Sequence, residues 1–155
     1  MTDAVTDWAE TTWTPEPTAN EITADTYETT VHARAVDPEF RVTVLSRYEQ
    51  TCPVSGVDHP GLLDVTHVLS WSEYPAYRAD LGNVLPLSKT HHAAFDRELF
   101  TIDREYRLCV NPAFETESDL LQRTILDQDG ERVALPEERM NPDYLARHNA
   151  SLVWV

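Results

Sequence analysis

The chain has 155 residues, of which 27 are acidic and 12 basic, and its formal net charge is −15. This length suits one domain with a real core, and no apolar run approaches the roughly 20 residues of a membrane-spanning helix. The start, MTDAVTDWAE, has neither the basic nor the apolar region of a secretory signal, so we expect a cytoplasmic protein. The acid excess, with Lys89 as the only lysine, favours a halophilic source over an acidic protein from a low-salt cell.

The negative charge is unevenly distributed along the chain. Residues 1–30 hold seven acids and no base, whereas residues 31–110 hold eleven acids and eight bases. Because binding to phosphates normally draws on lysine and arginine, a polyanion such as DNA should bind to the middle of the chain.

The predicted elements begin after an acidic segment. Residues 1–30 have no sustained apolar period and predict a flexible acidic arm, while residues 31–155 predict the domain itself. Apolar spacing over residues 37–50 predicts a short amphipathic helix, which CPVSG follows as a turn. The β-branched run GLLDVTHVLSW at residues 61–71 predicts a strand, and a polar loop follows at residues 72–83.

The second half of the chain predicts two further helices and a hairpin. HHAAFDRELF, residues 91–100, predicts a helix with Ser88 or Thr90 as its N-cap. Alternation over residues 101–112 predicts a hairpin or a single strand. A turn at DQDG and a last helix from about Pro142 complete an α+β domain.

Two adjacent histidines and an aspartate form the first cluster with chemical meaning. In a helix, His92 and Asp96 project from one face about 6 Å apart, a spacing at which two side chains hold one ion. His91 points roughly 100° away. An imidazole and a carboxylate with open coordination positions suit a divalent cation such as Mg²⁺, Mn²⁺ or Zn²⁺. His67, on the preceding strand, is placed to face the same ion as a base that takes a proton from water.

Several short motifs carry a resemblance to a known family. They are Cys52–Gly56, THVLSWSE at 66–73, GNVLPLS at 82–88 and HHAAFDRELFTID at 91–103. In this order they resemble the HNH endonucleases, also called His-Me finger or ββα-metal nucleases, in the branch without CxxC zinc pairs. The tail from Asp129 to Trp154 is similar to that branch as well, so the resemblance covers about residues 40–154. It implies an α+β fold with a ββα-metal core, flanking helices and a short extra hairpin.

The resemblance also implies roles for individual residues. His67 matches the general base, and Asn83 matches the asparagine whose amide braces the loop and orients that base. His92 and Asp96 match the metal-binding pair. His91 is the alternative ligand, because some relatives place this histidine one residue earlier, and helix geometry favours His92.

Two departures from the family pattern bear on the metal site. Many HNH enzymes carry an Asp or His before the base histidine, whereas this chain has Thr66. The third ligand is then water, or Asp64, which alternates onto the same strand face. Cys52 and Cys109 are interpreted as free thiols, and no structural zinc is predicted.

The resemblance implies a DNA endonuclease that hydrolyses phosphodiester bonds with a divalent metal ion, Mg²⁺ or Mn²⁺ before Zn²⁺. A restriction-like role is one setting, and a double-strand cut at a palindrome would favour a homodimer. The alternatives are a catalytically inactive DNA-binding or protein-binding module on the same scaffold, and an acidic arm that occupies the cleft as a DNA mimic. The candidate phosphate contacts are Arg41, Arg47, Arg78, Lys89 and Arg97, although such residues are more often solvated surface charges or partners of an adjacent acid.

Overall fold

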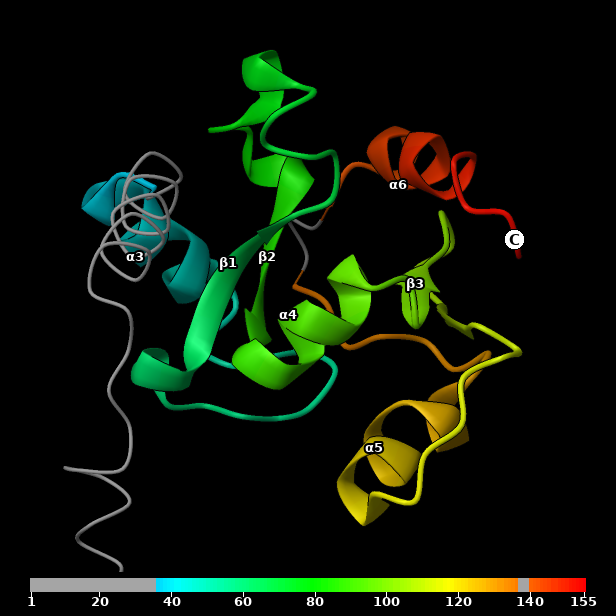
Figure 1. Cartoon of the computed structure of the whole chain (residues 1–155). Helices are drawn as coiled ribbons and strands as arrows, with labels where there is room; N and C mark the ends of the chain where they lie inside the picture. Colours follow the sequence, from blue (N-terminus) through cyan, green and yellow to red (C-terminus); the bar gives the residue numbers. More distant parts are fainter. Residues whose placement is uncertain (1–35, 137–139) are drawn as a thin grey trace, which may run out of the picture. The chain divides into compact units, whose positions relative to one another are not determined.

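The computed structural model of the chain describes residues 36–136 and 140–155. The predicted acidic arm, residues 1–30, lies outside the described residues. The helices and strands of the described part are α3 (Pro38–Arg47), β1 (Leu63–His67), β2 (Val84–Ser88), α4 (Lys89–Asp96), β3 (Phe100–Ile102), β4 (Leu108–Val110), α5 (Asp119–Thr124) and α6 (Pro142–Asn149) (Figure 1). Short 3₁₀ turns occur at Pro60–Leu62, Pro75–Tyr77, Leu81–Asn83 and Leu126–Gln128. This mixture of helices and small antiparallel sheets confirms the predicted α+β class.

The central unit is an antiparallel pair of strands followed at once by a helix. β1 pairs with β2 in a register that sets Leu63 opposite Ser88 and His67 opposite Val84. Ser88 ends β2 and caps α4, because its hydroxyl accepts a hydrogen bond of 3.1 Å from the backbone N–H of His91. The chain therefore turns directly from strand to helix, and α4 packs across both strands (Figure 1).

β3 and β4 form the hairpin predicted as one of two alternatives for residues 101–112. The Asp103 carboxylate accepts hydrogen bonds from the backbone N–H groups of Glu105 and Arg107, at 2.8 and 2.9 Å. These bonds give partners to two backbone N–H groups of the turn, in which Tyr106 has a φ of 67°. α5, which begins after the cap Ser118, is a helix that the sequence analysis did not predict.

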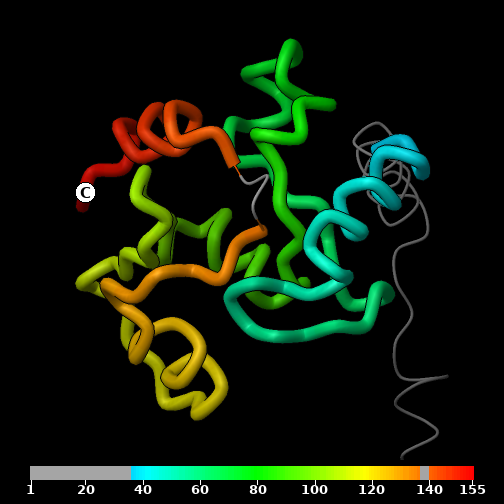
Figure 2. Tube along the Cα trace, turned by 180° about the vertical axis from the view of Figure 1, so that it is seen from behind, coloured from blue at the N-terminus to red at the C-terminus, as the bar shows by residue number. Residues whose placement is uncertain are grey.

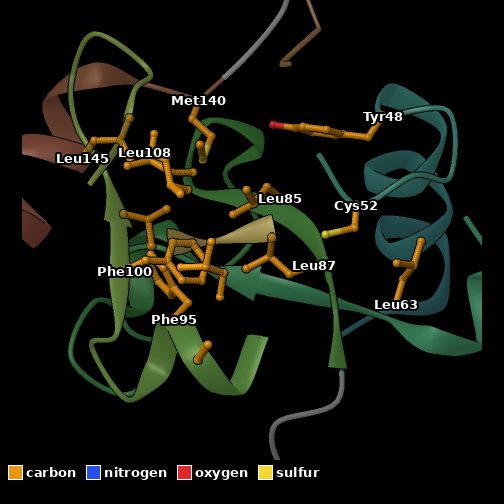
Figure 3. Close-up of a cluster of buried hydrophobic side chains, with 14 of the residues drawn as sticks. Tyr48, Cys52, Leu63, Leu85, Leu87, Phe95, Phe100, Leu108, Met140 and Leu145 are labelled. Carbon is orange, nitrogen blue, oxygen red and sulfur yellow. The ribbon is translucent and has the colours of Figure 1, made fainter. Parts of the chain in front are cut away.

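A single cluster of buried side chains joins the ββα unit to the other elements (Figure 3). α3 contributes Leu45, and α6 contributes Leu145, which is fully buried. α3 and α6 lie on opposite sides of the two strands of the ββα unit in both views (Figure 1, Figure 2). Apolar burial of this kind stabilises by about 25 cal/mol per Å² and fixes the helices against the sheet. The core also includes Leu63, Leu85, Leu87, Phe95, Phe100, Ile102, Leu108, Ile125 and Met140.

Candidate active site

The carboxylates of Asp64 and Asp96 flank the imidazole of His92. Nδ1 of His92 lies 2.9 Å from Oδ2 of Asp64, and Nε2 lies 3.1 Å from Oδ2 of Asp96. β1 carries Asp64 and one face of α4 carries the other two, so the packing of helix on strand brings them together. The predicted proximity of His92 and Asp96 is thus confirmed. Asp64, named as one alternative for a third ligand, joins the same chain of contacts.

These contacts shift the pKa values of the groups in opposite directions. The hydrogen bond to Asp64, then that to Asp96, raises the pKa of His92 to about 9, although burial opposes the shift. The hydrogen bond from His92 lowers the pKa of Asp64 to about 2, with Lys89 adding a second bond to the carboxylate at 2.7 Å. Without a metal ion, His92 is therefore an imidazolium between two carboxylates at neutral pH.

His67 ends β1 with one ring nitrogen bonded to the backbone. Its Nε2 lies 2.9 Å from the carbonyl oxygen of Arg78. A carbonyl oxygen only accepts, so Nε2 carries a hydrogen and, in the neutral ring, Nδ1 holds the lone pair. Burial lowers the pKa of His67, which keeps the ring neutral at physiological pH. Trp71 packs against the ring edge-on, with the ring centroids 5.4 Å apart.

Asn83 is fully buried and holds the connection between β1 and β2 at two points. Its Oδ1 accepts a hydrogen bond of 2.7 Å from the backbone N–H of Leu69. Its Nδ2 donates bonds of 3.1 Å to the carbonyl oxygens of Leu69 and Tyr77. Tyr77 adjoins Arg78, whose carbonyl bonds to His67. This geometry is what the expected bracing role of Asn83 requires.

A cleft of about 500 Å³ brings His67 and Asp96 onto one surface. We call it the His67 cleft, and its lining includes His67, Tyr74, Asp96, Arg147 and His148. Its walls come from the end of β1 with the loop that follows it, the end of α4, and α6. The base expected at His67 and the ligand expected at Asp96 therefore face a common space large enough for a phosphate group.

The structure does not bring His91 to this site, although the sequence left it open as a metal ligand. His91 is 1% exposed. Its Nδ1 lies 2.8 Å from the Ser88 hydroxyl and its Nε2 lies 2.8 Å from the Thr124 hydroxyl. Both ring nitrogens are thus engaged by hydroxyls in the interior, and His91 ties α4 to α5. The expectation of His91 as a ligand is corrected on this geometry.

The donor groups suit a hard divalent cation, although they are not arranged around one. An imidazole with two carboxylates is a set that Mg²⁺ or Mn²⁺ accepts. Among residues 36–136 and 140–155, however, no group of three or more His, Cys, Asp or Glu side chains is placed to hold a metal ion. Thr66, which precedes the base expected at His67, is fully buried, and its hydroxyl has no partner in the described part of the chain. For a metal ion to bind beside Asp64 and Asp96, a ring nitrogen of His92 must leave its carboxylate and contact the ion instead.

The five candidate phosphate contacts differ in what they touch. The Arg41 guanidinium donates to the carbonyl oxygens of Leu63 and Pro60, at 3.0 and 2.6 Å. Arg47 lines a different cleft, together with Tyr48.

The other three candidates have different surroundings. Arg78 stacks over Trp71 with its guanidinium carbon 4.6 Å from the ring centroid. Lys89 pairs with Asp64, and Arg97 follows α4 as an exposed residue. Arg147, which lines the His67 cleft, is a basic residue that the sequence analysis missed.

A comparison with known protein families agrees with this geometry, which consists of a strand pair, a capped helix, a histidine at the strand end and a buried asparagine. Residues 52–103 match the family model described as HNH endonuclease. Residues 52–103 are an HNH domain. The match contains β1, β2 and α4, and with them His67, Asn83, His92 and Asp96. Recognition of this family from the motifs is therefore confirmed, and the family points to nuclease activity on nucleic acid.

No curated protein matches the chain. Within the described residues, none of the helices is both long and apolar enough to cross a membrane. Cys52 is buried and Cys109 partly so, and both are free thiols as predicted.

Proposed function

We propose that this chain is a metal-dependent DNA endonuclease in which His67 activates the attacking water. The observation that carries the proposal is the position of His67. Its Nε2–H is held by the Arg78 carbonyl, which leaves Nδ1 as the base, and the ring lines the same cleft as Asp96. A neutral histidine with a fixed tautomer is the form that accepts a proton from water at neutral pH.

Asp64, His92 and Asp96 are the residues that would hold the divalent ion. Two carboxylates favour Mg²⁺ or Mn²⁺, with Zn²⁺ as the alternative. When bound, the ion neutralises negative charge on the pentacoordinate phosphate and on the leaving oxygen. Asn83 acts at a distance, because its bonds to Leu69 and Tyr77 hold the loop whose carbonyl orients His67.

The biological setting is part of the same proposal. A restriction-like nuclease would act on DNA in the cytoplasm, as a homodimer if it cuts both strands of a palindrome. A net charge of −15 with a single lysine fits a salt-adapted cell, in which concentrated salt screens repulsion between the protein and DNA.

Plasmid cleavage tests the function. Purified protein in molar KCl with Mg²⁺ or Mn²⁺ should nick or linearise supercoiled DNA, and EDTA should stop the reaction. His67→Ala should lose at least about 100-fold in rate, since general base catalysis contributes that much or more. His59→Ala is the matched control, because His59 is an exposed histidine outside the cleft whose Nδ1 caps a 3₁₀ turn. Intact plasmid with the unaltered protein, or equal cutting by His67→Ala, would refute the proposal.

A second candidate is a binding module that keeps the HNH scaffold without catalysis. Thr66 at the position of a common ligand favours it, as does the absence of a three-ligand group among the residues that the structure describes. Titration with Mn²⁺ separates the two functions. The nuclease should bind the ion in a way that His92→Ala and Asp96→Ala abolish, whereas the module would bind DNA with no such site.

A further inference from the structure

The C-terminal helix α6 lies outside residues 52–103 yet forms one wall of the His67 cleft. It is held firmly in that place. The Asn149 amide accepts a bond of 2.6 Å from the Thr101 hydroxyl and donates one of 3.0 Å to the Ile102 carbonyl. The His148 ring stacks on Phe95 of α4, with the centroids 4.9 Å apart. α6 thus presents Arg147 and His148 to the cleft from a fixed position.

Arg147 is the cation that α6 contributes to the cleft, and none of the acids in residues 36–136 and 140–155 pairs with it. Arg104, Arg107 and Arg123 lie 3.5, 3.9 and 2.9 Å from a carboxylate oxygen. No carboxylate within the described residues lies within 4.0 Å of Arg147. In a chain with 27 acids and 12 bases, an exposed arginine that lines a cleft and has no carboxylate partner in the described part of the chain is suited to bind an external anion.

An aromatic ring lies beside this cation. Tyr74 lines the same cleft, and the guanidinium carbon of Arg147 is 6.0 Å from its ring centroid. Tyr74 also stacks on Tyr77 at 6.1 Å, so the ring is supported from one side. The remaining charges of the lining include Glu73, Asp96 and Glu98, which repel phosphate. A nucleic-acid strand entering this cleft therefore needs a cation at its wall as well as the metal ion.

We propose that α6 is the second half of the substrate groove. In this arrangement Arg147 binds a backbone phosphate next to the one that is cut, and Tyr74 stacks on an adjacent base. Arginine suits a phosphate because its planar guanidinium group can donate two parallel hydrogen bonds to the phosphate oxygens. An aromatic ring such as that of Tyr74 can stack on any base. This inference rests on the proposed nuclease function and extends it to a named contact with the DNA backbone.

The salt dependence of DNA binding tests the role of Arg147. Each phosphate contact to a duplex contributes about 0.9 to the slope of log affinity against log salt. With His67→Ala as the parent, so that DNA stays intact in Mg²⁺, Arg147→Gln should flatten the slope for a labelled duplex by about 0.9. Over a fourfold rise in salt, the parent should then lose about 3.5-fold more affinity than Arg147→Gln. Arg147→Lys should retain most of the slope, because it keeps the charge.

Arg123→Gln is the matched control, since it removes the same charge from α5, outside the His67 cleft. Its slope should equal that of the parent.

The stacking role of Tyr74 has its own test. Tyr74→Leu should weaken DNA binding by roughly 5-fold or more with an unchanged salt slope, whereas Tyr74→Phe should leave the affinity unchanged.

The outcomes separate the two proposals. If the unaltered protein cuts plasmid while Arg147→Gln keeps the slope of the parent, or Arg123→Gln flattens it equally, the role of Arg147 is overturned and the nuclease stands. If the unaltered protein neither binds nor cuts DNA, both proposals fail.

Discussion

The buried amide of Asn83 gives the most quantitative prediction. Replacing it by aspartate changes one atom and leaves the volume unchanged, so no cavity forms. Oδ1 still accepts from the Leu69 N–H at 2.7 Å. The second oxygen of the introduced carboxylate instead faces the carbonyl oxygens of Leu69 and Tyr77, to which Nδ2 donates at 3.1 Å. Two hydrogen bonds are lost and three oxygens confront one another in the interior.

The cost follows from these contacts. Each lost bond with a buried partner costs about 1–1.5 kcal/mol, and burying a charge without a counter-ion adds to this. We expect Asn83→Asp to lower the free energy of unfolding at neutral pH by about 3 kcal/mol or more. Burial raises the pKa of the introduced carboxyl, so its neutral form is the more stable one when folded. The deficit should therefore shrink below the ordinary aspartate pKa of about 3.9 and grow as pH rises through the folded pKa.

Urea unfolding of the purified protein at neutral pH and near pH 4 measures both effects. Asn141→Asp is the matched control, because Asn141 caps α6 through Oδ1 alone, which accepts from the Asp143 N–H at 2.8 Å. An aspartate performs that task equally well, so the control should change stability by less than about 0.5 kcal/mol. If Asn83→Asp is as mild as Asn141→Asp at neutral pH, the bracing network does not exist in solution and the reasoning is refuted.

Three further predictions concern other parts of the molecule. His91→Ala should lower the unfolding midpoint and leave Mn²⁺ affinity unchanged in calorimetric titration, whereas His92→Ala should abolish Mn²⁺ binding; equal metal loss in both would contradict the assignment. Burial raises the pKa of Tyr48 to about 12, so its contribution to stability is complete below pH 10 and falls by roughly 2–3 kcal/mol as pH rises through 12; Tyr48→Phe should remove that alkaline loss in denaturant titrations. Asn149→Ala breaks two buried bonds to β3 and should cost about 2–3 kcal/mol in urea unfolding, and a change below about 0.5 kcal/mol would show that α6 is not held there.

Much of the element order could be predicted from the sequence, because helix spacing and helix starts depend on residues that are close together in the chain. Helix spacing placed His92 and Asp96 on one face, and in the structure Nε2 of His92 lies 3.1 Å from Oδ2 of Asp96. The helix predicted to begin at about Pro142 begins there, since proline suits a first helical position. The strand predicted over residues 61–71 is shorter, because β1 ends at His67, where the loop braced by Asn83 begins.

Other features depend on contacts that no local pattern encodes. β2 was not predicted, because all five of its residues are buried and it shows no alternation, and Pro86 weakens a strand pattern. His91 and His92 differ by one position, and only the Thr124 hydroxyl, 33 residues away, shows that His91 belongs to the interior. The bond between His67 and the Arg78 carbonyl, and the place of α6 in the cleft, are likewise tertiary contacts.

The most direct test of the central claim is a crystal structure of the protein with Mn²⁺, measured for its anomalous scattering. The account predicts a peak bound by His92 and Asp96 on the side of the His67 cleft, with Nδ1 of His67 facing the same space. A peak elsewhere in the molecule, or a His67 ring whose Nδ1 points into the interior, would contradict it.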